Sequence, residues 1–248
     1  MATIEQNFDL WNNAYKWPEG GDEWSKAWGG ADMQWHGTIW PRIHKYFPTG
    51  RILEIAPGFG RWTQFLIKNC ASLHGVDLSQ KCIESCQIRF DNELNVSFKQ
   101  NDGKDLSNIE NNSIDLVFSF DSLVHAEKEV IQSYVSQIKN ILKEDGVGII
   151  HHSNLGNWLK HRRKEDFAHH WRAESMTYQL FEQMLRNNDL QCISQEIFNW
   201  GNQPEYLIDC ITIFTKSSKK INQTLIENGN FMLEAELVKN ISHAYCAF

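Results

Sequence analysis

This sequence lacks the cysteine spacings that are typical of metal sites and of redox-active cysteine pairs. Its six cysteines, at positions 70, 82, 86, 192, 210 and 246, form no Cys-x-x-Cys pair and no zinc-like spacing. We expect free, mostly buried thiols in a cytoplasmic protein. Asp121, His125 and the histidines at 151–152 and 169–170 would suit zinc, manganese or iron by ligand type, but the tight His-Glu-x-x-His spacing is absent. The sequence predicts no metal.

Long apolar runs and an excess of positive charge are also missing. No segment has the length and hydrophobicity of a membrane span, and the start MATIEQNFDL lacks a signal-peptide pattern. The formal net charge is −7, which argues against a partner held by neutralising nucleic-acid phosphates. We therefore expect a cytoplasmic protein without a membrane span and without a nucleic-acid partner.

Tryptophan, in contrast, is abundant and clustered. The ten tryptophans fall in the first 62 residues and between residues 158 and 200. Residues 1–49 predict an aromatic-rich N-terminal cap, in which most rings fill the groove against the main domain and Trp35 reaches the ligand. A helix is expected from about His36 to Phe47, ending before Pro48.

The stretch from Arg51 to Trp62 organises the chain. Ile52 to Ile55 reads as a buried strand that carries an unexpected carboxylate, Glu54, and runs into a turn containing Gly58 and Gly60. Glycine lets a ligand approach the backbone closely and lets φ become positive. The helix expected from about residue 61 would point its free N–H groups at that ligand. This pattern predicts a site for a nucleotide-like cofactor.

Strands and helices alternate from residue 51 onward, which predicts a doubly wound α/β sheet with ligands at the carboxyl ends of its strands. A hairpin near the C-terminal end makes one edge strand antiparallel. We expect helices at about 61–69, 79–93, 128–143 and 176–188, and seven strands near 52–55, 72–77, 96–99, 114–120, 148–152, 190–198 and 206–215. Ser79 is the expected N-cap of the second helix.

Three regions follow from this pattern. Residues 50–216 form the main domain, with an insertion at about 154–175 that is expected to be a lid over the ligand. Residues 217–248 are expected to form a helical extension, which packs either on its own chain or on a neighbour in a homo-oligomer.

Two kinds of cofactor compete for the glycine turn. The dinucleotide fingerprint Gly-x-Gly-x-x-Gly would place its third glycine at Thr63, whose side chain is too large for close packing between helix and strand. This departure weakens the alternative of a NAD-type Rossmann oxidoreductase. A non-catalytic cofactor-binding protein is a further alternative.

The pattern Glu54-x-Ala56-x-Gly58-x-Gly60 resembles the first motif of the class I S-adenosylmethionine-dependent methyltransferases, an acid followed by three alternating glycines. The departure is Ala56-Pro57 at the first glycine. The resemblance extends over about residues 50–215 as an order of elements. It implies a Rossmann-like fold, S-adenosylmethionine as cofactor and S-adenosylhomocysteine as product.

The resemblance also implies roles in cofactor binding. Asp77 would accept hydrogen bonds from both ribose hydroxyls, and Asp102 from the adenine amine. Glu54 would lie near the methionyl amino group, directly or through water. The full set of expected cofactor residues is Trp35, Glu54, Ala56, Gly58, Gly60, Asp77, Leu78, Asp102, Gly103 and Phe120.

Methyl transfer to a hydroxyl requires alignment of the acceptor and removal of a proton. Histidine titrates near neutrality, so His125 is the first candidate base and His152 the second. His151 and His152 should point to opposite faces of their strand. The basic and aromatic insertion suggests an acceptor with sugar rings, phosphate or carboxylate. The expected acceptor-binding residues are Asp121, His151, Asn154, Trp158, His170, Trp171 and Arg172.

The sequence therefore predicts methylation of a small-molecule or glycan-like acceptor, at a hydroxyl with a histidine base. Methylation of a nitrogen or carbon atom of a natural product is the alternative within the same family.

Overall fold

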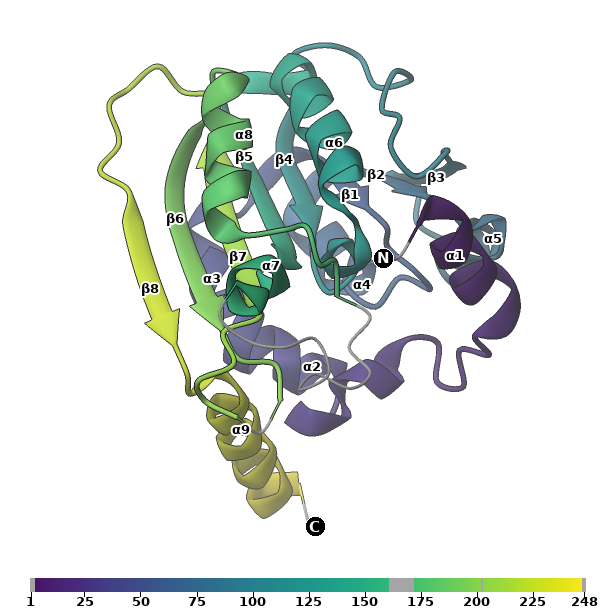
Figure 1. Cartoon of the computed structure of the whole chain (residues 1–248). Coiled ribbons are helices and arrows are strands. Elements are labelled where there is room, and N and C mark those ends of the chain that lie inside the picture. The colour runs from purple at the N-terminus through teal and green to yellow at the C-terminus, as the bar shows by residue number, and fades with distance from the viewer. Residues whose placement is uncertain (1–2, 161–171, 202, 247–248) are drawn as a thin grey trace.

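The computed structural model describes residues 3–160, 172–201 and 203–246 (Figure 1). The predicted alternation of strands and helices is confirmed from residue 49 onward. The strands are β1 (Thr49–Ile55), β2 (Cys70–Asp77), β3 (Val96–Gln100), β4 (Ile114–Ser119), β5 (Leu142–Ser153), β6 (Gln191–Phe198), β7 (Asp209–Thr215) and β8 (Thr224–Asn228). The helices are α1 (Ile4–Phe8), α2 (Ala31–Gln34), α3 (Trp40–Ile43), α4 (Thr63–Leu66), α5 (Gln80–Arg89), α6 (Lys128–Ile141), α7 (Leu155–Leu159), α8 (Tyr178–Asn187) and α9 (Phe231–Cys246).

Short helical turns of other types complete the chain, mostly in the cap. They are η1 (Asp9–Ala14), η2 (Asp22–Trp28), η3 (Trp35–Ile39), η4 (His44–Tyr46), η5 (Ile67–Asn69) and η6 (Leu123–His125). The expected helix at 36–47 is thus the succession η3, α3 and η4, and it ends before Pro48 as predicted. The helix after the glycine turn starts at Thr63, two residues later than expected.

One sheet holds the described strands in the order β3-β2-β1-β4-β5-β7-β6-β8. This is the expected doubly wound α/β architecture, with eight strands instead of the predicted seven. The antiparallel strand is β7, which pairs antiparallel with both β5 and β6. It therefore lies inside the sheet and not at its edge. The additional strand β8 pairs parallel with β6 and forms the edge.

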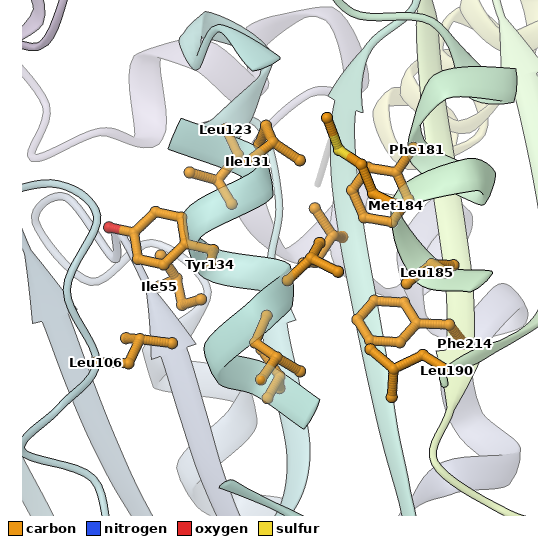
Figure 2. Packing of buried hydrophobic residues seen from close by; sticks show 14 of the residues in the cluster. Ile55, Leu106, Leu123, Ile131, Tyr134, Phe181, Met184, Leu185, Leu190 and Phe214 are labelled. Carbon is orange, nitrogen blue, oxygen red and sulfur yellow. The ribbon is translucent and has the colours of Figure 1, made fainter. Parts of the chain in front are cut away.

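Apolar layers on both faces of the sheet explain why its central strands are apolar along their length. On one face, buried residues of α6 and α8 pack on β1, β4, β5 and β7, as Figure 2 shows for Ile131, Tyr134, Phe181 and Phe214. The other face is covered by α4, α5 and the N-terminal cap. Ser79 and Thr177 cap the starts of α5 and α8, since their hydroxyls accept hydrogen bonds from the N–H groups of Cys82 and Leu180.

Residues 217–248 are more than a helical extension, because β8 joins the sheet before α9 begins. Helix α9 packs against the cap elements η2, α2 and η3. Arg42, in α3 of the cap, links the cap to the sheet and to α9. Its guanidinium forms ion pairs with Glu196 of β6 (2.6 Å) and Glu234 of α9 (2.9 Å). The sequence did not reveal β8 because its side chains are mostly exposed and do not alternate clearly between apolar and polar.

Candidate active site

The glycine turn has the backbone geometry that its sequence pattern requires. Ala56, Gly58 and Gly60 all have positive φ, at +58°, +59° and +83°. A Cβ atom on Gly60 would lie 2.4 Å from Cε2 of Phe90, so only glycine fits there. Ala56 is an L residue held in the left-handed region, which accounts for the preference for glycine at this position of the motif.

Asp77, the acid at the end of β2, lies beside this turn. Its carboxylate accepts hydrogen bonds from the N–H groups of Gly58 (3.1 Å) and Ser79 (2.8 Å). Burial raises the pKa of Asp77 to about 6, and the backbone donors oppose that rise only in part. The carboxylate of Asp77 is therefore positioned at the carboxyl end of the sheet and is ready to accept further hydrogen bonds.

A single cavity of about 560 Å³ occupies the carboxyl ends of β1, β2 and β4, beneath the N-terminal cap. Its size falls within the range of small-molecule sites, roughly 300–1,000 Å³. The cavity wall brings together many of the predicted site residues: Ala56, Gly58, Asp77, Leu78, Gly103, Phe120, Asp121, His125 and Arg172.

Other predicted site residues are described by the structure but are not part of this wall. They are Trp35, Glu54, Gly60, Asp102, His151, His152, Asn154 and Trp158. His170 and Trp171 lie outside the described residues.

Glu54 and Asp102 have internal partners. Glu54 is buried beneath the turn and accepts a hydrogen bond from the Thr63 hydroxyl (2.6 Å). Burial raises the pKa of Glu54 to about 8, so this group is largely protonated at neutral pH. Asp102 is exposed, and its carboxylate accepts from the N–H groups of Lys104 and Asp105, the turn-capping arrangement typical of aspartate.

Trp35 belongs to the apolar core between cap and sheet and not to the cavity. Its ring is 1% exposed and stacks on Phe65 at 5.0 Å between ring centroids. The packing interpretation of the cap tryptophans therefore applies to Trp35, and its expected contact with the cofactor has no support in the structure.

His151 and His152 point to opposite faces of β5, as their adjacency predicts. His152 is fully buried and stacks on Phe181. One of its ring nitrogens lies 2.8 Å from the Thr212 hydroxyl and the other 2.9 Å from the Ser153 carbonyl. Burial lowers the pKa of His152 to about 3. This placement argues against the predicted role of His152 as a base.

His151 lies just behind the cavity, in contact with three residues of its wall. Its ring packs against Phe120 and Trp200. Nδ1 of His151 accepts a hydrogen bond from the N–H group of Asp121 (3.1 Å), and its Nε2 lies 3.5 Å from Asp209. Because Asp121 has a φ of +63°, this contact holds a strained residue at the end of β4. His151 thus supports the wall from behind.

Asn154 and Trp158 lie in the segment that follows β5. The Asn154 side chain accepts from the N–H group of Tyr178 and donates to the carbonyl of Leu207. Trp158 packs edge-on against Tyr206, with 5.0 Å between ring centroids. Both side chains therefore connect the segment after β5 to the loop before β7.

Two arginines in the cavity wall are held by buried carboxylates. Arg172 forms a two-point contact with Asp209, at 2.9 and 2.7 Å, and its guanidinium lies over the Trp200 ring. Burial raises the pKa of Asp209, but Arg172 and then His151 outweigh burial and hold that pKa well below its ordinary value. Arg61, which follows Gly60, pairs with Asp121 at 2.7 Å.

An N-terminal strap, residues 7–17, covers part of the cavity. The Asn12 side-chain oxygen accepts hydrogen bonds from the Ser79 hydroxyl (2.9 Å) and the N–H group of Lys81 (3.2 Å). Trp17 stacks on Phe59 of the glycine turn at 4.5 Å. On the other side of the cavity, the Asn7 side chain donates to the carbonyl of His125. A bound ligand would have to displace this strap to enter or leave.

We expect the Asn12→Ala substitution to weaken binding of S-adenosylhomocysteine by about five- to tenfold, because a lost helix-capping contact costs about 1 kcal/mol. Titration calorimetry measures this change. The Asn92→Ala variant, altered at an exposed asparagine outside the cavity wall, serves as the control and should bind like the wild type. Equal affinity of the Asn12→Ala variant and the wild type would show that the strap does not retain the ligand.

Sequence reasoning missed several residues that the fold brings to the site. Arg61, Trp11, Trp17, Trp24 and Trp200 contribute to the cavity wall, and Asp209 anchors Arg172 from behind. Asp209 had a recognisable signal, since it is a carboxylate at the start of an otherwise apolar strand, as Glu54 is within β1. For the tryptophans the signal was their clustering, which does not say which rings reach the cavity.

The described residues hold neither a metal-binding cluster nor a membrane-spanning helix. They contain no group of three or more His, Cys, Asp or Glu side chains that could hold a metal ion. They also contain no helix that is both long and apolar enough to span a membrane. The five cysteines with described side chains, at positions 70, 82, 86, 192 and 210, are free thiols.

Comparison with known proteins places this fold and site in context. Residues 52–146 match the family model described as methyltransferase domain, and a search of curated protein sequences finds no match. Geranyl diphosphate methyltransferase in complex with GPP and sinefungin is similar, with a TM-score of 0.66 at 11% identity, covering 86% of this chain and 98% of that one.

Two further solved structures are also similar. An S-adenosylmethionine-dependent methyltransferase from Clostridium acetobutylicum ATCC 824 has a TM-score of 0.58 at 18% identity, with 78% and 92% of the two chains covered. A protein from Pyrococcus horikoshii OT3 has a TM-score of 0.58 at 19% identity, with 84% and 95% covered. At these identities the likeness establishes the fold.

The match over residues 52–146 shows that this chain contains a methyltransferase domain, and the strand order and the glycine turn agree with the fold of its structural neighbours. The chain is an enzyme of EC 2.1.1.-, and S-adenosylmethionine is its cofactor. The residues present fit this cofactor, because a buried acid, a glycine turn and the small residue Gly103 lie around one cavity.

Proposed function

We propose that this methyltransferase acts on a hydroxyl group of a small-molecule or glycan-like acceptor, with His125 as the general base. The bound cofactor supplies a methyl group activated by a sulfonium. The protein must align the acceptor oxygen, exclude water and accept a proton. The hydroxyl proton would pass to a ring nitrogen of His125 as the oxygen–methyl bond forms and the sulfur–methyl bond breaks.

The observation that carries this proposal is the composition of the cavity wall. Residues at the glycine turn and at the ends of β2 and β4 share one enclosed space with His125. The ring of His125 packs against that of Trp11, with 5.4 Å between centroids, and both residues line the cavity. His152, the other candidate base, is on the far face of the sheet. A cavity of this size suits a small acceptor, or the end of a longer one, better than a protein surface.

For the cofactor half of the cavity we propose the roles implied by the family resemblance. Asp77 accepts from the ribose hydroxyls, Leu78 packs on the adenine face and Gly103 leaves room for the base. Leu78 and Gly103 are adjacent in the structure, since a Cβ atom on Gly103 would lie 3.2 Å from Leu78. Glu54 would influence the methionyl end of the cofactor indirectly, because its carboxyl group lies beneath the turn and accepts a hydrogen bond from Thr63.

The raised pKa of Asp77 gives this assignment a pH test. Asp77 accepts hydrogen bonds best as a carboxylate, and its pKa is about 6. Protonation below pH 6 therefore weakens binding, and the affinity for S-adenosylhomocysteine should fall up to about tenfold per pH unit. Calorimetric titrations of the wild type and Asp77→Asn between pH 5 and 8 measure this slope. The variant should bind weakly at all pH values and lack the slope; a retained slope would assign the titration to another group.

The methylated atom can be determined directly. The enzyme is incubated with S-adenosylmethionine that carries a trideuterated methyl group and with mixed hydroxyl, amine and activated-carbon acceptors. Mass spectrometry detects each product, and NMR locates the methyl group. Transfer to oxygen supports the proposal. Transfer only to nitrogen or carbon would contradict it and leave the class of enzyme unchanged.

A further inference from the structure

The cavity has a wall of aromatic rings that begins at the surface. Trp24 lines the cavity and yet is 44% exposed, so its ring stands at the mouth. It contacts Trp11 at 6.2 Å and Tyr15 at 5.4 Å between ring centroids. Trp11 in turn contacts His125 at 5.4 Å. The Trp24 and Trp11 rings meet edge to face, with 72° between their planes, so aromatic rings follow one another from the mouth to the proposed base.

The charged groups of the same wall compensate one another. Arg61 and Arg172 are the arginines of the described wall, which contains no lysine. Arg61 is paired with Asp121, and Arg172 is paired with Asp209. Each guanidinium already has a buried or nearly buried carboxylate within 2.7 Å, so neither needs an anionic ligand for charge balance. Within the described residues, an acceptor phosphate or carboxylate would meet no uncompensated cation.

A ligand for such a wall should have a flat apolar face and uncharged polar edges. Aromatic faces carry negative charge density and attract the weakly positive C–H bonds of a saturated ring. The hydroxyl groups at the edge of that ring can hydrogen-bond to Asp121, Arg172 or His125. A sugar in its pyranose form has both features.

We propose that the acceptor is an uncharged pyranose ring, which stacks on Trp24, next to Trp11, so that one of its hydroxyls meets His125. This inference rests on the proposed function and specifies its substrate class. Among the described residues, Arg61 and Arg172 serve as paired hydrogen-bond donors and not as a phosphate site.

Saturation-transfer NMR tests this proposal with the S-adenosylhomocysteine-bound enzyme. The probes are the methyl α-pyranosides of glucose, galactose and mannose, their 6-phosphates, and catechol as a planar hydroxyl compound without a sugar ring. We expect at least one uncharged glycoside to bind, with its ring protons saturated, and its 6-phosphate to bind no more tightly.

Three variants connect the signal to the aromatic wall. Trp24→Ala should weaken glycoside binding by about tenfold, and Trp24→Phe should restore most of it. Tyr245→Ala removes an exposed ring from α9, outside the cavity wall, and should have no effect. Affinity for S-adenosylhomocysteine should stay unchanged in all three variants.

Several results would overturn the proposal. Binding of catechol alone would exclude a sugar subsite, although a hydroxyl acceptor and the His125 assignment would survive. A 6-phosphate that binds at least tenfold more tightly would exclude an uncharged acceptor. The absence of any glycoside signal at millimolar concentrations would exclude the stacking site. A parallel loss of S-adenosylhomocysteine affinity in Trp24→Ala would show that this ring holds the cap and does not contact the acceptor.

Discussion

The His125→Ala variant is expected to lower kcat by about 10²- to 10⁴-fold, the usual contribution of a positioned general base. The reason is that an alcohol is a poor nucleophile until its proton is removed during methyl transfer. His125 lies in η6, directly after β4, and its carbonyl is fixed by the Asn7 side chain at 3.1 Å. This backbone contact does not depend on the imidazole, although the imidazole also packs on Trp11 of the cap, so cofactor affinity is measured alongside turnover.

Measurements of kcat, KM and cofactor affinity separate the possible roles of His125. A base is indicated if kcat falls, S-adenosylhomocysteine binds as before, and added imidazole restores part of the rate. His44→Ala is the control, since His44 is an exposed histidine outside the cavity wall. A rise in acceptor KM at constant kcat would make His125 a binding residue. Turnover near that of the wild type would refute the assignment.

The parts of this site that follow from local sequence could be predicted, and the parts that depend on distant contacts could not. Gly58, Gly60 and Asp77 were recognisable because each is tied to the end of a strand. Asp209 has its partner, Arg172, 37 residues earlier in the chain, and this pairing exists only once β7 lies beside β5. The sequence therefore indicated Arg172 as a ligand contact but not the carboxylate that compensates its charge.

The N-terminal cap could also be predicted only in part from the sequence. The clustering of its tryptophans predicted an aromatic cover, but not the fate of each ring. Trp28 and Trp35 are buried in the core, whereas Trp11, Trp17 and Trp24 line the cavity. The cap consists of short helical segments without a sustained period, so its side-chain directions depend on the surface beneath it. Position in the sequence alone does not determine them.

The Asp209→Ala variant is expected to lose about 3–5 kcal/mol of unfolding free energy, the usual cost of leaving a buried charge without its partner. Asp209 is fully buried, and the Arg172 side chain is 8% exposed, so the guanidinium would lose its carboxylate partner in a largely buried position. The same substitution removes the group facing Nε2 of His151. Urea denaturation of the intact chain measures the difference, with Asp145→Ala as the control. Asp145 lies in an exposed ion pair with Lys219 and should change stability by less than about 1 kcal/mol.

A second substitution shows whether the uncompensated charge is the cause. Combining Asp209→Ala with Arg172→Leu removes both charges and should recover a large part of the lost stability. If the single variant loses less than about 1 kcal/mol, or if the double variant is less stable than the single one, the ion pair does not stabilise this part of the fold.

The dependence of the unfolding free energy on pH in the acid range is an independent measure of the Arg172–Asp209 ion pair. The pKa of Asp209 is held below its ordinary value of 3.8. The unfolded chain therefore binds this proton before the native state does, and the native state loses stability as the pH falls below about 4. The stabilisation by Asp209 is complete at neutral pH and decreases in acid. The wild type should consequently lose its stability advantage over Asp209→Ala as the pH is lowered from 5 toward 2, and a constant difference across that range would assign the pair's contribution to packing.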